Sequence, residues 1–322
     1  MSRCYLIMDI GGTKTTGALF TEDGKIVDDY TYVARSQTFK GEKAVYKNTK
    51  DVLNHIIEKF HIDMDDVLGI GVGCPGPLDT KAGVIIHAPM MKWINFPLVK
   101  RLKEDFKKPV ALDNDGNLGA LAEQRCGQAQ GLKHVMYMTV STGCGGGILI
   151  NGDIYHGKND GALEVGHISI EREGLQCPCG NKGCFELYAS GTAMNRRLKE
   201  DMKKNKKSLV FELAGYDEEK IEGSLLTEAA KHGDGYAIHF LKQEGYFLGV
   251  GVANLFNAFD PDVLVLGGGV TKAKAFFHEE MMRVAKSRCL HTIHEDSIRY
   301  SIMNDKVVLY GAYHLIKEHL NK

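Results

Sequence analysis

The sequence contains no long hydrophobic run and carries almost no net charge. No apolar stretch among its 322 residues approaches the roughly 20 residues that a membrane-spanning helix needs. The formal net charge is -1, so no excess of basic side chains favours nucleic acid or an anionic membrane surface. We therefore expect neither a membrane nor a nucleic-acid partner.

The N-terminus lacks the pattern of a secretory signal peptide, because MSRCYLIMDI enters a predicted strand at once. Eight cysteines are present, and five of them are scattered through apolar or glycine-rich segments: Cys4, Cys74, Cys126, Cys144 and Cys289. This spacing does not indicate a disulfide framework. We therefore predict a protein of the reducing cytoplasm.

The composition is that of a soluble enzyme, with 43% hydrophobic and 25% charged residues. The length allows two domains with substantial cores. Short apolar strands alternate with amphipathic helices, so the pattern predicts an α/β fold. Helices are expected at 44–60, 117–125, 242–259 and 307–320, and strands at 67–72, 110–112 and 263–266.

The most specific motif is a cluster of cysteine and histidine. His167, Cys177, Cys179 and Cys184 fall within eighteen positions of the segment GHISIEREGLQCPCGNKGCFE. Three thiolates and one imidazole suit tetrahedral zinc and leave no position for a reacting water. We therefore predict a structural Zn²⁺ that fixes the polar residues around it. The alternative is three buried cysteines and an unrelated histidine.

A pattern of strand, glycine turn and strand occurs twice, at residues 5–24 (YLIMDIGGTKTTGALFTEDG) and 135–153 (VMYMTVSTGCGGGILINGD). The repetition predicts a duplicated fold with one such hairpin in each half. Glycine turns let backbone N–H groups approach a polyphosphate. The candidate phosphate-binding residues are Gly11, Gly12, Thr13, Lys14, Thr142 and Gly143. The alternative is two ordinary hairpins whose glycines satisfy turn geometry only.

Neither turn has the GxxxxGK[ST] or GxGxxG pattern, so those two classes of phosphate-binding loop are disfavoured. A third glycine turn, formed by Gly267, Gly268 and Gly269, lies between a predicted strand and a predicted helix. Free N–H groups at a helix N-terminus bind anions, so this turn is a candidate nucleotide contact.

The segment LDNDGN at 112–117 places polar side chains between a strand end and a helix start. A proton-abstracting carboxylate must be fixed within about 2.6–3.2 Å of its hydroxyl, and such a junction can fix one. Asp115 is the candidate base, and Asn114 is a candidate hydrogen-bonding partner of the substrate. The alternative is that these residues only cap the helix.

These motifs together resemble the ROK family (repressor, open reading frame, kinase), and within it the bacterial ATP-dependent glucokinases. The resemblance rests on DIGGTK, GCPGPLD, DNDGNLGALAE, NAFDPDVLVLGGGV and the GH…CxCGxxGCxE element, and it covers nearly the whole chain. It implies an actin-like (ribonuclease H-like) duplicated α/β fold with two lobes around a central cleft. It further implies a small lobe of residues 1–114 and about 303–322, and a large lobe of residues 115–302 with the zinc-binding loop.

The resemblance also implies an activity, the transfer of the γ-phosphoryl group of ATP to a hexose hydroxyl, with O6 of glucose as the first expectation. Asp115 is then the base, and the residues implied to bind the sugar are Gly76, Asn114, Asp115, Glu164, His167 and Glu186. Mg²⁺ accompanies the ATP, with Asp9 holding the metal through water. The turn at 267–269 is expected near the adenosine, and a homodimer is the family expectation.

The chain departs from the usual pattern at two positions. Leu163 stands where many relatives have glycine before the sugar-binding glutamate, and Met90 stands where asparagine is usual. Glucose is therefore not the only possible acceptor, and kinases of N-acetylmannosamine, fructose, allose or β-glucosides are the alternatives. The phosphoryl donor is open as well, since some relatives use polyphosphate.

Two other classes of protein compete with a sugar kinase. Sugar-responsive repressors of the same family carry an added N-terminal helix-turn-helix domain, and the first predicted strand begins within five residues of Met1. The repressor interpretation is therefore disfavoured. An actin-like or chaperone-like ATPase that binds proteins is disfavoured because the zinc motif is flanked by Glu164 and Glu186.

Overall fold

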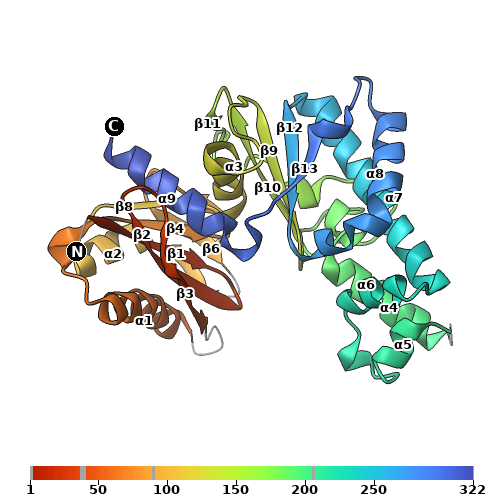
Figure 1. The fold of residues 1–322 in the computed structure, drawn as a ribbon, viewed down its shortest axis with the longest axis horizontal. Helices are drawn as coiled ribbons and strands as arrows, with labels where there is room; N and C mark the ends of the chain where they lie inside the picture. The colour runs from red at the N-terminus through yellow and green to blue at the C-terminus, as the bar shows by residue number, and fades with distance from the viewer. Residues whose placement is uncertain (1–2, 37–40, 89–90, 205–206, 322) are drawn as a thin grey trace. The chain divides into compact units, whose positions relative to one another are not determined.

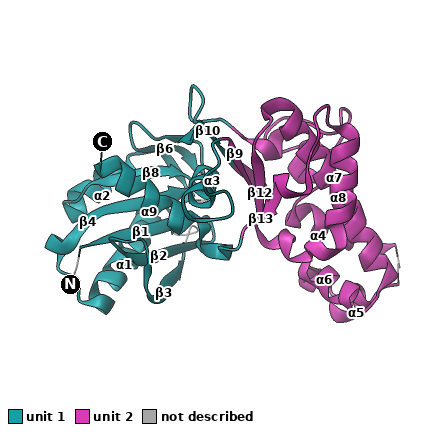
Figure 2. Ribbon diagram, turned by 45° about the horizontal axis from the view of Figure 1, so that its top comes forward, with its two compact units in different colours: residues 1–133, 147–162, 302–322 teal, residues 134–146, 163–301 magenta. Residues whose placement is uncertain are grey.

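The computed structural model describes residues 3–36, 41–88, 91–204 and 207–321. The chain forms two compact units, drawn in different colours in Figure 2. Unit 1 comprises Met1–Lys133, Gly147–Ala162 and Ile302–Lys322, and unit 2 comprises His134–Gly146 and Leu163–Ser301. Each unit is described by itself below.

Unit 1 is built on a mixed sheet with the strand order β3-β2-β1-β4-β8. Its strands are β1 (Cys4–Ile10), β2 (Lys14–Thr21), β3 (Ile26–Arg35), β4 (Val67–Cys74) and β8 (Val110–Asn114). The first three strands pair antiparallel, whereas β4 and β8 run parallel to β1. A smaller antiparallel sheet contains β5 (Leu78–Asp79), β6 (Val84–Ala88) and β7 (Trp93–Phe96).

Helices cover both faces of the large sheet of unit 1. Because successive strand residues point to opposite faces, Leu6 and Met8 belong to one core cluster, whereas Tyr5 and Ile7 belong to another. The first cluster also contains residues of α1 (Glu42–Phe60) and α2 (Leu98–Phe106). The second contains residues of α3 (Asp115–Cys126) and α9 (Val307–Leu320), and Figure 1 shows α9 lying along this sheet.

The second large sheet repeats the design of the first. Its strands are β9 (Val135–Val140), β10 (Cys144–Ile150), β11 (Asp153–Ile154), β12 (Val263–Gly267) and β13 (Ile298–Tyr300). The strand order is β11-β10-β9-β12-β13, which matches β3-β2-β1-β4-β8 position by position. As in the first sheet, the last two strands are parallel to the central one. The predicted duplication of the fold is therefore confirmed.

Unit 2 contains most of the remaining helices: α4 (Gly191–Lys203), α5 (Leu209–Leu213), α6 (Ser224–Lys231), α7 (Gly235–Phe259) and α8 (Lys274–Arg288). The predicted helix at 242–259 begins earlier, at Gly235, because the Asp234 side chain accepts a hydrogen bond from the backbone N–H of Ala237. Small residues let α7 and α8 pack closely, since a Cβ added at Gly249 would lie 2.6 Å from the Met281 carbonyl oxygen.

Short 3₁₀ helices connect these elements: η2 (Met64–Asp66), η4 (Val165–His167), η5 (Phe185–Leu187), η6 (Glu218–Lys220), η7 (Gly269–Ala273), η8 (Glu295–Ser297) and η9 (Asn304–Lys306). Among the described residues, no helix has the length and apolar character needed to cross a membrane.

The compact units differ from the predicted lobes in where α3 belongs. The sequence-based division began the second lobe at residue 115, whereas the structure places residues 115–133 and 147–162 in unit 1. Strand β8 runs directly into α3, and α3 packs closely on α9, so that a Cβ added at Gly311 would lie 2.0 Å from the Leu118 carbonyl oxygen. The C-terminal helix does return to the first sheet, as the sequence predicted.

Candidate active site

The carboxyl ends of three neighbouring parallel strands bring polar groups together in unit 1. Asp9 on β1 pairs with Gly73 on β4, and Gly73 pairs with Asp113 on β8. Ligands in α/β sheets bind outside these strand ends. Burial and, to a smaller extent, the nearby Asp115 carboxylate together raise the pKa of Asp9 to about 7. Two acidic groups therefore share one partly desolvated region, an arrangement that suits a bound cation.

Asp115 begins helix α3, directly after the end of β8. Asn114 caps this helix through its side-chain oxygen, which accepts the backbone N–H of Gly116 at 2.8 Å. Asp115 Oδ1 accepts the same N–H at 2.8 Å. Burial raises the pKa of Asp115, although these backbone hydrogen bonds oppose the shift. Asn114 thus has the expected capping role. Asp115 is a buried carboxylate that accepts the backbone N–H of Gly116.

The structure brings together Gly76 and Asn114, two of the predicted sugar-binding residues. A Cβ added at Gly76 would lie 3.4 Å from Asn114 Nδ2, at the edge of ordinary contact. Since Asn114 Oδ1 is used by the helix cap, its amide group is the part left to donate to a ligand.

The turn between β1 and β2 is held by a residue that the sequence analysis missed. The hydroxyl of Ser36 donates to the Gly11 carbonyl oxygen at 2.6 Å, and the Ser36 backbone N–H donates to the Thr13 carbonyl oxygen at 3.0 Å. Ser36 is fully buried at the end of β3, and no local sequence signal marks it. Thr13 and Lys14 are exposed, and Lys14 Nζ lies 3.0 Å from Asp305 Oδ2.

The corresponding turn in unit 2, between β9 and β10, is held by the start of helix α4. The backbone N–H of Gly191 donates to the Ser141 carbonyl oxygen at 2.7 Å, and that of Thr192 donates to the Thr142 carbonyl oxygen at 3.2 Å. A Cβ added at Gly143 would lie 3.0 Å from Glu186 Oε2. A predicted phosphate residue and a predicted sugar residue are therefore neighbours.

A cavity of ≈ 520 Å³ lies in unit 2 beside this turn. Its lining residues come from the turn, from α4 and α6, and from η7: Ser141, Thr142, Gly191, Thr192, Met194, Asn195, Glu222, Gly223, Ser224, Thr227, Glu228, Lys231, Gly269, Val270, Lys272 and Ala273. Of the three predicted glycines at 267–269, only Gly269 lines it. Cβ atoms at Gly267 and Gly268 would lie 2.2 Å from the Tyr137 hydroxyl and 2.3 Å from the Val140 carbonyl oxygen. Packing alone therefore accounts for those two glycines.

The sequence analysis missed most of this lining. The residues come from segments that are far apart in the chain, and residues 222–231, which supply six of them, carry no recognisable motif. One polar atom in the lining stands out, because the buried side-chain oxygen of Asn195 has no hydrogen-bond partner within the described part of the chain.

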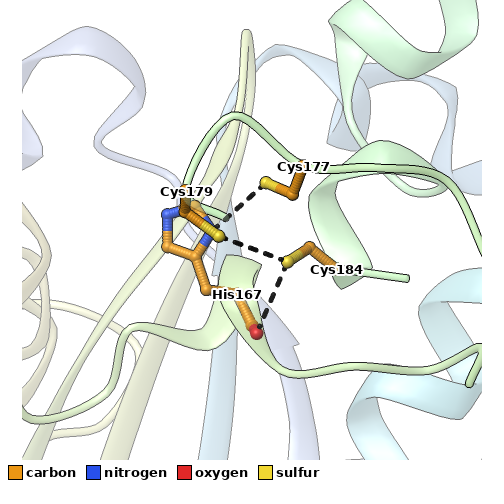
Figure 3. Close-up of side chains that lie close together, drawn as sticks. All are labelled: His167, Cys177, Cys179 and Cys184. Carbon is orange, nitrogen blue, oxygen red and sulfur yellow. Dashed lines mark hydrogen bonds between the residues drawn. The ribbon is translucent and has the colours of Figure 1, made fainter. Parts of the chain in front are cut away.

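The four predicted metal ligands converge in unit 2, as Figure 3 shows. Their ligand atoms all lie within 4.8 Å of one another. Cys177 Sγ is 3.8 Å from His167 Nδ1, and Cys179 Sγ is 3.7 Å from Cys184 Sγ. A tetrahedron with metal–sulfur bonds of about 2.3 Å has edges of about 3.8 Å. The donor set and its spacing therefore fit a tetrahedral Zn²⁺.

Burial raises the pKa of the Cys177 thiol and raises that of Cys184 to about 12, whereas the backbone N–H of Asn181 lowers the pKa of Cys179. Binding of a divalent cation requires these thiols to lose their protons, so metal affinity depends on pH. Glu186 Oε1 lies 3.6 Å from His167 Nδ1, so the cluster also fixes a predicted sugar residue.

Glu164 lies in a tight turn next to this cluster. The backbone N–H of Val165 donates to the Leu163 carbonyl oxygen at 2.7 Å, and that of His167 donates to the Glu164 carbonyl oxygen at 3.0 Å. Leu163 itself has a φ of 63°, a left-handed conformation that favours glycine. Met90, the other position where the chain departs from its relatives, lies outside the described residues.

Comparisons with known proteins give relatives that cover most of the chain. A glucokinase of Halalkalibacterium halodurans is 38% identical over 84% of this chain and 82% of its own length. A glucokinase of Thermotoga maritima is 34% identical over 83% of this chain and 82% of its own length. The crystal structure of a ROK family glucokinase from Streptomyces griseus in complex with glucose and AMPPNP matches with a TM-score of 0.84 and 28% identity, covering 98% of this chain and 99% of that one.

These likenesses and the two sheets of equal strand order confirm the expected actin-like α/β fold. The model of the ROK family matches residues 5–319, almost the entire sequence. The chain therefore belongs to the ROK family.

Proposed function

We propose that the protein is an ATP-dependent hexose kinase that transfers the γ-phosphoryl group of ATP to O6 of glucose. The observation that carries this proposal is the position of Asp115. This carboxylate is buried at the carboxyl end of a parallel strand, is held by backbone, and lies close enough to Asp9 to raise its pKa. The 38% identity to a glucokinase supports glucose as acceptor.

In unit 1, Asp115 removes the proton of the attacking sugar hydroxyl. A base works best when its pKa approaches the working pH, and burial shifts the pKa of Asp115 in that direction. Asn114 donates its side-chain amide to a neighbouring sugar hydroxyl, and the missing side chain of Gly76 leaves room for the ring.

The β1–β2 turn of unit 1 binds the transferring phosphoryl group. Gly11, Gly12, Thr13 and Lys14 supply backbone N–H groups and one positive charge. Asp9 is the carboxylate that would hold the Mg²⁺ bound with ATP, and this ion would supply positive charge against the phosphates. For this role Lys14 must exchange its exposed partner Asp305 for a phosphate.

In unit 2, Glu164, His167 and Glu186 form hydrogen bonds with hydroxyl groups of the sugar in this proposal. His167 presents Nδ1 to the cysteine cluster, so its Nε2 is the nitrogen left for the sugar. The Cys/His cluster holds a structural Zn²⁺ that fixes His167 and Glu186. Thr142, Gly143 and Gly269 bind the nucleotide, and the cavity beside them is large enough for an adenosine. Gly267 and Gly268 shape the strand end behind Gly269.

The test is ADP formation from Mg·ATP, or consumption of polyphosphate, with a panel of hexoses, N-acetylmannosamine and β-glucosides. We expect glucose-dependent turnover that falls about 10²- to 10⁴-fold in Asp115→Asn with little change in either KM. Glu186→Gln is the matched carboxylate-to-amide control, and it should mainly raise the KM for the sugar. Preference for another sugar would correct the acceptor, and sugar binding without any turnover would favour the repressor class.

We also propose a cytoplasmic homodimer. Sedimentation equilibrium of the purified chain and fractionation of its cells test these two points. A monomer at the concentrations that support turnover would contradict the first, and recovery outside the cytoplasmic fraction would contradict the second.

A further inference from the structure

A buried carboxylate lies two positions before the proposed base. Asp113 is 1% exposed at the end of β8, and its two oxygens have different partners. Oδ1 accepts the backbone N–H of Asn114 at 2.7 Å and the Asn117 side-chain amide at 2.9 Å. Asp113 therefore fixes both the peptide that leads to Asp115 and the first turn of α3.

The other oxygen of Asp113 meets a histidine from a distant part of unit 1. His156 Nε2 lies 2.7 Å from Asp113 Oδ2, within hydrogen-bonding distance. His156 follows strand β11, and its side chain is 30% exposed. Its carbonyl oxygen accepts the backbone N–H of Ala162 at 3.2 Å, which closes the loop that leads towards Glu164. His156 is thus held through its side chain and through its backbone.

The charges around His156 favour its protonated form. The hydrogen bond to Asp113 raises the pKa of His156, and the Asp160 carboxylate raises it further, whereas burial and the Lys81 ammonium oppose the shift. Asp160 is itself fixed, since it accepts the backbone N–H of Thr80 at 2.8 Å. A protonated His156 makes a charge-assisted hydrogen bond and offsets the negative charge of Asp113 beside the base.

We propose that His156 is a positioning residue for the reaction, which holds Asp113 so that Asn114 and Asp115 keep the geometry needed for proton abstraction. This inference rests on the proposed kinase function. His156 touches none of the reacting atoms in this assignment and acts through Asp113. Nothing in the local sequence around either residue signals the pair, because 43 positions separate them.

The test compares His156→Ala with His156→Gln, in which the side-chain amide replaces Nε2–H as a neutral donor. Misplacement of a catalytic group by about 1 Å lowers turnover as much as about 10²-fold. We therefore expect kcat of His156→Ala to fall by about 10- to 100-fold with an unchanged KM for ATP, and His156→Gln to recover most of the loss. The exposed His239→Gln, in α7, is the matched control and should behave as the wild type.

A second readout is the titration of the histidine side chains by NMR. We expect one histidine signal, which should be missing from the spectrum of His156→Gln, to titrate at a higher pH than the other histidine signals. In Asp113→Asn this signal should lose its shift.

Three results would overturn the inference: wild-type kcat in His156→Ala, a kcat of His156→Gln as low as that of His156→Ala at equal melting temperature, or no shifted histidine. A loss of kcat that only parallels a loss of melting temperature would also overturn it, since it indicates a purely structural role. Absence of sugar-dependent turnover in the wild type would instead contradict the proposed function itself.

Discussion

The two glycine turns share a sequence pattern but are supported in different ways. The β1–β2 turn is held from within by buried Ser36, and its exposed end carries Lys14. The β9–β10 turn is held by the start of α4, and it borders Glu186 instead of a lysine. The two turns thus have similar backbones and different surrounding side chains.

The same contrast extends to the units as wholes. In unit 1, the polar groups lie at strand ends, where the pairing of β1, β4 and β8 fixes Asp9 and Asp113 on either side of Gly73. In unit 2, the polar groups sit on loops, and the Cys/His cluster is what brings His167 and Glu186 together. A sheet keeps its geometry through its own hydrogen bonds, whereas a loop with this donor set would depend on a bound metal ion.

Loss of the metal should destabilise unit 2 and leave the stability of unit 1 unchanged. This is the largest effect expected from the comparison. Cys177→Ser, or prolonged chelation, removes a structural ligand, and we expect a loss of more than about 4 kcal/mol in the free energy of unfolding. Affinity for the sugar should fall with it. Zinc content, thermal denaturation and sugar titration measure the three effects. Cys289→Ser, a free cysteine outside the cluster, is the control.

The interpretation of the cluster would be contradicted by a Cys177→Ser variant that keeps both its melting temperature and its sugar affinity. Amide hydrogen exchange measured segment by segment in Cys177→Ser sharpens the comparison. Only the backbone amides of unit 2 should lose protection from exchange.

Each unit also contains a buried carboxylate whose pKa is raised to about 7, Asp9 in unit 1 and Glu244 in unit 2. Between pH 3.8, its ordinary pKa, and about pH 7, Asp9 is protonated to a larger extent in the folded protein than in the unfolded chain. Its contribution to the free energy of unfolding therefore falls as the pH rises through this range. Asp9→Asn should therefore raise the free energy of unfolding at about pH 8, by at most about 4 kcal/mol, with no gain below about pH 4. Turnover should be lost.

Glu244→Gln is the matched change in unit 2, and its sign should be opposite. Glu244 is paired with Arg197, and the amide would leave a buried guanidinium without its carboxylate. Breaking such a pair destabilises by about 3–5 kcal/mol. Denaturant unfolding of both variants at two pH values measures the difference, and two effects of the same sign would refute this assignment.

The smallest expected effect is a difference between alanine substitutions in the two glycine turns. A Cβ at Gly11 would lie 2.9 Å from the Lys14 carbonyl oxygen, whereas a Cβ at Gly143 would lie 3.0 Å from the end of the Glu186 side chain. Gly11→Ala must therefore shift backbone, and we expect a loss of about 1–2 kcal/mol together with a higher KM for ATP. Gly143→Ala should keep its stability within about 0.5 kcal/mol, and it should raise the KM for the sugar, through Glu186, as well as the KM for ATP. Melting temperatures and the two KM values test this, and identical behaviour of the variants would show that the turns are equivalent.

Local patterns allowed much of the fold to be predicted. The last helix was expected at 307–320 and spans Val307–Leu320, because its apolar spacing is helical throughout. Helix starts were less well predicted: α3 and α7 begin before the expected residues, since Asn114 and Asp234 cap them. The division at residue 114 differed from the compact units because packing of α3 on α9 is a long-range contact.

The sequence alone determined the family, the duplicated architecture and the Cys/His cluster, because short segments of the chain are enough to identify each of them. These segments are two glycine turns, one acidic strand end and one Cys/His motif. Only the tertiary structure decided which groups surround them. Ser36 under the first turn, His156 on Asp113 and the lining of the cavity in unit 2 all come from residues distant in the chain. The reason is physical: hydrogen-bond partners and cavity walls are chosen by packing in space, and packing leaves no periodic or local trace in the sequence.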